Sequence, residues 1–144
     1  MRWVDPFGLD EINPSDVEII HTYSGDYLGG IADMVGGWSD MKDAGTIGAD
    51  AYFHCRANCE ASKRGQGGYD AAKKLSALRE AIQNEPPAER SQDEAANAQG
   101  QCAGKNNPNV DCYKACSNLI PPSGIPRRHL PPNANPIHIL KPKR

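Results

Sequence analysis

The sequence predicts an all-α domain of four to five short helices, stapled by disulfides and followed by a disordered, proline-rich basic tail. Apolar residues recur at spacings of three and four in several segments, which is the period of a helix that packs on one face. Four of the five cysteines form two Cys-x-x-x-Cys pairs, and seven prolines fall within residues 121–144. We therefore expect helices and crosslinks up to residue 120 and irregular structure after it.

The hydrophobic core is expected to be small. The 144 residues suit one domain, but only 38% of them are hydrophobic and the mean hydropathy is −0.65. Domains with little core usually depend on crosslinks or metals. No apolar run approaches the roughly 20 residues of a membrane span, and residues 1–10 lack the apolar centre of a signal peptide. Neither a span nor a signal peptide is therefore expected.

Charge is distributed unevenly along the chain. Residues 1–126 carry 11 basic residues against 18 acidic ones, whereas residues 127–144 carry five basic residues and no acid. A basic tail can meet anionic partners, although a solvated tail is the commoner explanation. Because the body is acidic, extensive contact with nucleic-acid phosphates is disfavoured, and a nuclease would rely on the tail.

The helical pattern divides the chain into ordered segments. Residues 10–26 are expected to form a loop with a brief strand or turn. In residues 27–42 an apolar stripe is weakened by four glycines, each by about 1 kcal/mol relative to alanine. A capping-box pattern, Ser91-x-x-Glu94, opens a later helix. The expected helices span residues 27–42, 50–63, 69–83, 91–100 and 110–119.

The paired cysteines suit a disulfide framework. Cys at positions i and i+4 share a helix face, so two antiparallel helices would pair Cys55 with Cys116 and Cys59 with Cys112. Connectivity cannot be proved from a sequence, and a four-cysteine zinc site or free thiols remain alternatives. Structural zinc sites usually use shorter loop spacings, so no metal site is expected. Disulfides would imply an oxidising compartment.

A candidate catalytic site lies on the helix that carries the first cysteine pair. Asp50 and His54 are four residues apart and can form a carboxylate–imidazole pair that raises the basicity of the ring. Glu80, Asp93 and Asn97 could converge on this pair from neighbouring helices. Such a group suits general-base activation of water, with or without a divalent metal, although an Asp–His pair on a helix is more often a surface contact.

The first residues carry a short motif, Asp5-Pro6-Phe7-Gly8-Leu9, that resembles the end of the core region of Rhs/YD-repeat polymorphic toxins. The resemblance implies self-cleavage at the Leu9–Asp10 junction, with Arg2 and Asp5 in the cleavage machinery. Residues 50–119 also resemble a C-terminal module of Rhs-type proteins. That pattern comprises Asp50 to Ala61, Gly67 and Gly68 with Arg79 and Glu80, Asp93 to Gly100, and the Cys112/Cys116 pair. The implied domains are residues 1–9, a helical toxin domain over 10–120, and the tail over 121–144.

The resemblance implies a toxic C-terminal effector used in competition between bacteria. Its partners would be a cognate immunity protein and the rest of the Rhs shell, with a target-cell membrane or lipid also possible and nucleic acid less favoured. It would be secreted and delivered into the periplasm or inner membrane of a target bacterium. The activity would be an envelope-acting hydrolase centred on His54 and Asp50. The alternatives are a membrane-perturbing or pore-forming toxin using the Gly-rich segment 27–41, a nuclease, and a non-enzymatic disulfide-stapled binding module. No cofactor can be assigned.

Overall fold

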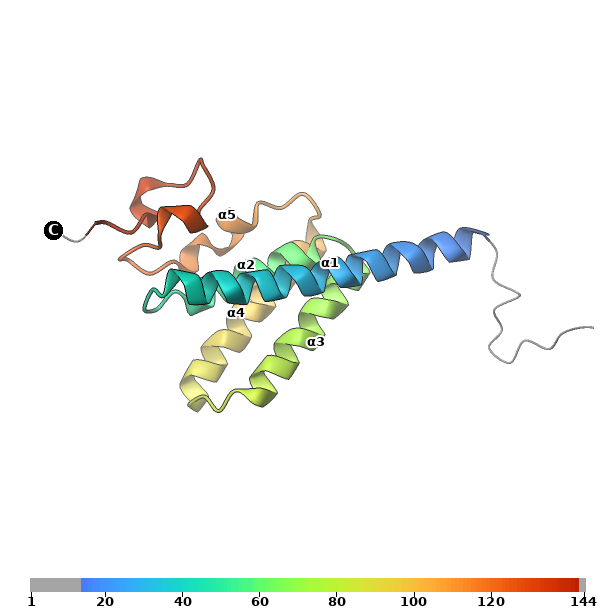
Figure 1. The fold of residues 1–144 in the computed structure, drawn as a ribbon, viewed down its shortest axis with the longest axis horizontal. Helices are drawn as coiled ribbons and strands as arrows, with labels where there is room; N and C mark the ends of the chain where they lie inside the picture. The colour runs from blue at the N-terminus through green and yellow to red at the C-terminus, as the bar shows by residue number, and fades with distance from the viewer. Residues whose placement is uncertain (1–13, 143–144) are drawn as a thin grey trace, which may run out of the picture.

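The computed structural model describes residues 14–142, and the predicted all-α fold class is confirmed over this part of the chain (Figure 1). It contains five α-helices and three short 3-10 helices, with a single isolated bridge between Ile125 and Ile139 instead of a sheet. No helix within these residues has the length and apolar character needed to cross a membrane. The elements are α1 (Pro14–Ala44), α2 (Asp50–Ser62), α3 (Gln66–Ile82), α4 (Pro87–Asn106), α5 (Cys112–Cys116), η2 (Ser117–Leu119), η3 (Arg127–His129) and η4 (Pro136–His138).

Helix α1 is much longer than expected. It begins at Pro14 and runs for 31 residues, so the loop and brief strand expected over residues 10–26 are wrong from Pro14 onward. Proline suits the first position of a helix, because its missing N–H would have no partner there. The β-branched residues near Ile19 and Ile20 disfavour a helix by only a few tenths of a kcal/mol each. A continuous helix is therefore compatible with the segment.

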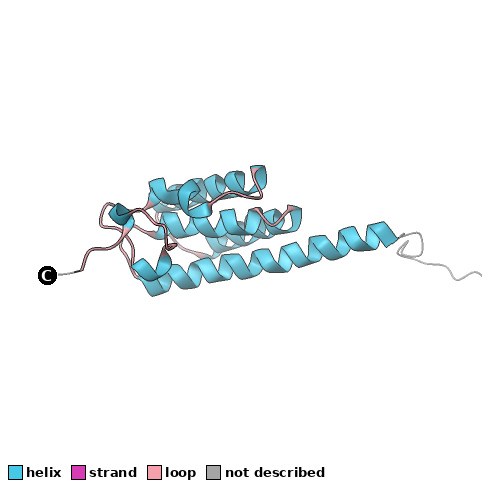
Figure 2. Cartoon of the chain, turned by 90° about the horizontal axis from the view of Figure 1, so that it is seen from above, coloured by secondary structure: helices cyan, strands magenta, loops and turns pink. Residues whose placement is uncertain are grey.

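Helix α2 occupies the centre of the fold. It contacts α1, α3, α4 and α5, and most of its residues are buried. Helices α3 and α4 form an antiparallel pair on one side of α1, and the C-terminal segment covers the opposite side (Figure 1). The first half of α1 extends beyond the other helices (Figure 2).

Glycines allow the helices to approach closely. A methyl group at Gly100 of α4 would lie 2.9 Å from the carbonyl carbon of Cys55 and 3.0 Å from Cβ of Asn58, both on α2. In α1, a Cβ at Gly30 would lie 2.9 Å from the backbone of Gly68 on α3. Two of the glycines that weaken the helical pattern of residues 27–42, Gly30 and Gly37, therefore mark contacts between helices.

Two disulfides join α2 to the end of the domain. Cys55 is bonded to Cys116 and Cys59 to Cys112, with Cα–Cα distances of 5.8 and 5.7 Å. The pairing is the one expected for antiparallel helices, so the four thiols are not free to hold zinc. Cys102 is unpaired and exposed on α4.

The proline-rich tail has no long helix or strand, as expected, but residues 121–142 are packed rather than disordered. Ile125 is fully buried and Leu130 is 7% exposed. The backbone N–H of Ile125 donates to the carbonyl of His138 at 2.8 Å. The Arg128 Nε atom lies 2.9 Å from Oδ2 of Asp43 on α1. Apolar side chains thus attach the tail to the core, and part of its positive charge meets the acidic body.

Candidate functional site

A group of buried polar side chains lies where α2, α3 and α4 meet. His54 and Asn58 come from α2, Glu80 from α3, and Asp93 and Asn97 from α4; each is at most 8% exposed. Four of the five predicted catalytic residues therefore belong to one buried region. Asp50, the fifth, is exposed at the first residue of α2.

The predicted pairing of His54 with Asp50 is replaced by a contact with Asp93. His54 Nε2 lies 3.7 Å from Asp93 Oδ2, which is too long for a hydrogen bond. Burial lowers the pKa of His54 to about 4, and the positive charge of Arg79 contributes further. The imidazole is therefore neutral at pH 7.

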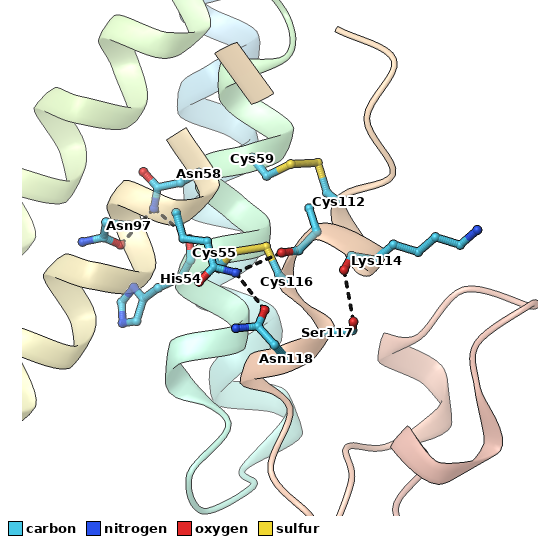
Figure 3. Close-up of a disulfide and its surroundings, with 12 residues drawn as sticks. His54, Cys55, Asn58, Cys59, Asn97, Cys112, Lys114, Cys116, Ser117 and Asn118 are labelled. Carbon is cyan, nitrogen blue, oxygen red and sulfur yellow. Dashed lines mark hydrogen bonds between the residues drawn. A yellow bond between two sulfur atoms is a disulfide. The ribbon is translucent and has the colours of Figure 1, made fainter. Parts of the chain in front are cut away.

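Asn58 organises a hydrogen-bond network that sequence reasoning missed. Its Nδ2 donates to the His54 carbonyl at 2.7 Å and to Asn97 Oδ1 at 2.9 Å. Its Oδ1 accepts from Ser76 Oγ and Gln101 Nε2, both at 2.9 Å. An amide side chain can donate two hydrogen bonds and accept two, so Asn58 makes all the hydrogen bonds that it can. Asn58 therefore links the three helices, and Figure 3 shows it with His54 and Asn97 where α2 meets α4, beside the disulfides to α5.

Three carboxylates crowd together next to this network. Oxygens of Glu80, Glu85 and Asp93 lie within 4.8 Å of one another. Both oxygens of Glu80 and Oε2 of Glu85 are buried without a hydrogen-bond partner. Burial, and then the neighbouring Glu85, raises the pKa of Asp93 to about 7 and also raises the pKa of Glu80. Glu85 was not predicted as a site residue. It precedes Pro86-Pro87 in the connection between the helices that carry Glu80 and Asp93, and this position could have indicated that it lies near them.

Access limits what these residues can do as catalysts. A hollow of about 350 Å³ opens beside Glu80 and Asn97, but its lining does not include His54, which is 2% exposed. A general base must reach the proton that it removes. Catalysis at this group stays a prediction. The predicted self-cleavage residues Arg2, Asp5, Leu9 and Asp10 lie outside the described residues.

The first half of α1 presents a separate, apolar surface. Val17, Ile19, Ile20 and Leu28 are each more than half exposed. Ile19 and Tyr23 also line a hollow of about 450 Å³ that reaches Gln66 and Gly67 at the start of α3. Sequence reasoning missed this surface because residues 10–26 were expected to be a loop.

The segment predicted to perturb membranes, residues 27–41, is largely committed to the core. Met34 is fully buried, and Gly30 and Gly37 are buried where α1 meets the other helices. A Cβ at Gly30 would press on α3, and one at Gly37 on Ala57 of α2. The glycines therefore serve packing, and the segment is not a free amphipathic helix.

Comparison with known proteins identifies relatives for most of the chain. Residues 21–128 match the family model described as serum amyloid A protein. Serum amyloid A protein of Anas platyrhynchos is 35% identical over 104 residues, covering 72% of this chain and 76% of the relative. Serum amyloid A-1 protein of Homo sapiens is 35% identical over 111 residues, with coverages of 75% and 82%. Serum amyloid A protein of Equus caballus is 47% identical over 62 residues, covering 43% and 56%.

These matches overturn the toxin assignment. The module-like residues 50–119 fall inside the serum amyloid A match, and the Asp5–Leu9 motif lies outside it. An Rhs toxin, an envelope-acting or membrane-perturbing effector, an immunity-protein partner, an Rhs shell and delivery into a bacterium are all wrong, because the relatives are vertebrate serum amyloid A proteins. With residues 21–128 matched and two relatives at 35% identity over most of their length, the chain belongs to the serum amyloid A protein family.

Proposed function

We propose that this chain is a secreted, apolipoprotein-like protein that binds lipid surfaces through the first half of α1. The observation that carries the proposal is the set of exposed apolar side chains around the first half of α1, Val17, Ile19, Ile20 and Leu28, which we call the α1 apolar surface. Two disulfides suit an oxidising, extracellular location. The names of the relatives refer to serum, which supports the same location.

The α1 apolar surface includes the continuation of a buried helix face. Ile19, Tyr23, Gly30, Met34 and Gly37 follow one another at spacings that keep them on one side of a helix. The face is covered at Met34, which is fully buried, but Ile19 is 66% exposed. The same side of α1 thus serves the core along its second half and lacks a covering helix along its first turns. An apolar surface of this kind suits an interface.

The amount of exposed surface predicts reversible binding. Burying a whole aliphatic side chain contributes about 1.5–3 kcal/mol, so four half-exposed side chains contribute at most roughly 3–6 kcal/mol, since they do not all lie on one side of the helix. An affinity of 1 mM corresponds to about 4 kcal/mol, so a single chain is expected to bind and release lipid rather than insert permanently. Residues 14–31 contain Asp16, Glu18 and Asp26 and no Lys or Arg. Zwitterionic lipid is therefore favoured over anionic lipid.

The test is flotation of the protein with phosphatidylcholine vesicles. We expect wild-type protein to float with the vesicles and the double variant Ile19→Ser/Ile20→Ser to lose at least tenfold in binding. The matched control is Ile47→Ser, because Ile47 is 95% exposed in the connection between α1 and α2. Equal binding by all three proteins, or no binding by wild type, would refute the proposal.

Self-association is the competing use of the same surface. Sedimentation of the same proteins without lipid separates the two cases. If wild type forms oligomers that the double variant cannot form, and neither protein binds vesicles, then the α1 apolar surface joins copies of the chain instead.

A further inference from the structure

We propose that Glu80, Glu85 and Asp93 form a binding site for a divalent metal ion, with the imidazole of His54 beside Asp93. The site lies between α3 and α4 and faces α2, away from the α1 apolar surface, so it does not depend on the proposed lipid binding. The sequence left open whether a divalent metal joins His54, Glu80 and Asp93, and it did not indicate Glu85, which lies in a connection between helices.

The distances fit one ion. Oxygens of the three carboxylates lie within 4.8 Å of one another. Oxygen ligands lie about 2.0–2.2 Å from zinc and about 2.3–2.6 Å from calcium, so two ligands on opposite sides of an ion are roughly 4–5 Å apart. The 3.7 Å between His54 Nε2 and Asp93 Oδ2 is also a spacing that two ligands of one ion adopt. The three carboxylates would hold the ion, with the His54 imidazole beside them.

Three of the carboxylate oxygens lack a hydrogen-bond partner. Glu80 is 8% exposed, and neither of its carboxylate oxygens receives a hydrogen bond. Oε2 of Glu85 is likewise buried and unpaired. The His54 side chain, 2% exposed, lies beside them, with its Nε2 3.7 Å from Asp93 Oδ2. Buried polar groups without partners are rare and costly, and a cation would satisfy them together.

Nearby cations are engaged elsewhere. The guanidinium of Arg79 lies over the Trp38 ring, 5.0 Å from its centroid. Arg90 Nη2 donates to the Gln83 carbonyl at 3.3 Å. Neither arginine forms an ion pair with the three carboxylates among the described residues. The negative charge is therefore left without a counter-ion from the protein.

The donor set indicates the class of ion. Carboxylates alone would suit calcium or magnesium, whereas an added neutral imidazole favours zinc or manganese. The competing explanation is a proton shared by Asp93 and Glu85, which would relieve the repulsion without a metal. The two explanations differ in what they predict for added ions and for neutral variants.

The test uses the full chain without an affinity tag and with Cys102→Ser, so that the exposed thiol cannot bind zinc. After treatment with a chelator, Zn²⁺, Mn²⁺ and Ca²⁺ are titrated separately by calorimetry. We expect saturable one-to-one binding of Zn²⁺ or Mn²⁺ that is about 100-fold weaker or absent in Glu80→Gln and Asp93→Asn. His54→Gln should weaken binding by about 10–100-fold, the usual effect of a group beside the ligands. Glu89→Gln, an exposed acid in the first turn of α4, should bind as wild type does.

Two results would overturn the proposal. One is the absence of saturable binding for all three ions; the other is unchanged binding in both Glu80→Gln and Asp93→Asn. If these variants fail to fold, adding Mn²⁺ to the wild-type protein tests whether the ion binds at the three carboxylates. Its paramagnetism should broaden the NMR signals of Glu80, Glu85 and Asp93 before others, and broadening elsewhere alone would refute the site.

Discussion

Adding one methyl group at Gly100 tests the close approach of α4 to α2. In Gly100→Ala the new Cβ would lie 2.9 Å from the Cys55 carbonyl carbon and 3.0 Å from the Asn58 Cβ. Carbon atoms normally approach to about 3.5–4.0 Å, and the Cys55 carbonyl oxygen lies nearer to the new Cβ than either carbon, so the helices must separate by about 1 Å or more. The obstacle is backbone, and Cys55 is held by a disulfide, so neither a rotamer change nor a local shift relieves it.

The magnitude follows from two opposing effects. Alanine is about 1 kcal/mol better than glycine inside a helix, while overpacking costs about 1–3 kcal/mol and more where relaxation is blocked. We expect a net loss of about 2 kcal/mol, which lowers the melting temperature by roughly 6–10 °C for a domain of this size. The control Gly36→Ala has open space around the new Cβ, so it should gain up to about 1 kcal/mol. Differential scanning calorimetry measures both, and stabilisation of similar size in the two variants would refute the close contact.

Two further predictions concern acid and redox conditions. The folded pKa of His54, about 4, lies below its ordinary value of 6.5, so its contribution to stability is present above pH 6.5 and lost as the pH falls toward 4. Urea unfolding with a chelator present should show wild type losing about 3 kcal/mol relative to His54→Gln between pH 7.5 and 4; parallel curves would contradict a neutral, buried ring. The disulfides close loops of 61 and 53 residues, so the first closure contributes about 4 kcal/mol and the second only about 2. Cys59→Ser/Cys112→Ser should therefore cost about 2 kcal/mol in urea unfolding, replacement of all four cysteines about 6, and Cys102→Ser close to none; equal costs for the double and quadruple variants would contradict loop closure as the cause.

Local patterns in the sequence predicted much of the fold. Cysteines spaced i, i+4 on two antiparallel helices predicted the disulfides Cys55–Cys116 and Cys59–Cys112, and both are present. The expectation that Glu80, Asp93 and Asn97 could converge on His54 is also met, since all four are buried where α2, α3 and α4 meet. Helix α1 was underestimated because its first part, from Pro14 to Asp26, was expected to be a loop with a brief strand or turn. The glycine-rich part was predicted to be helical, and Gly30 and Gly37 pack against other helices.

Other features depend on tertiary packing that periodicity does not reveal. Prolines in the tail exclude long regular helices, but Ile125 and Leu130 are still buried in the core. Glu85 lies outside every predicted helix, so its approach to Glu80 and Asp93 required the fold of the α3–α4 connection. The family itself could not be recovered from a nine-residue stretch at the start of the chain, since the matched region begins at residue 21.

The two crosslinks also give the chain a closed covalent ring. Residues 59–112 begin and end at one disulfide, so α3 and α4 belong to a loop whose ends cannot separate. A protease that cuts once inside this ring leaves both fragments joined until both disulfides are reduced. A cut in α1, which precedes the ring, releases the α1 apolar surface from the rest. Cleavage in α1 can therefore separate its first half from the chain, whereas cleavage within residues 59–112 leaves the pieces covalently joined.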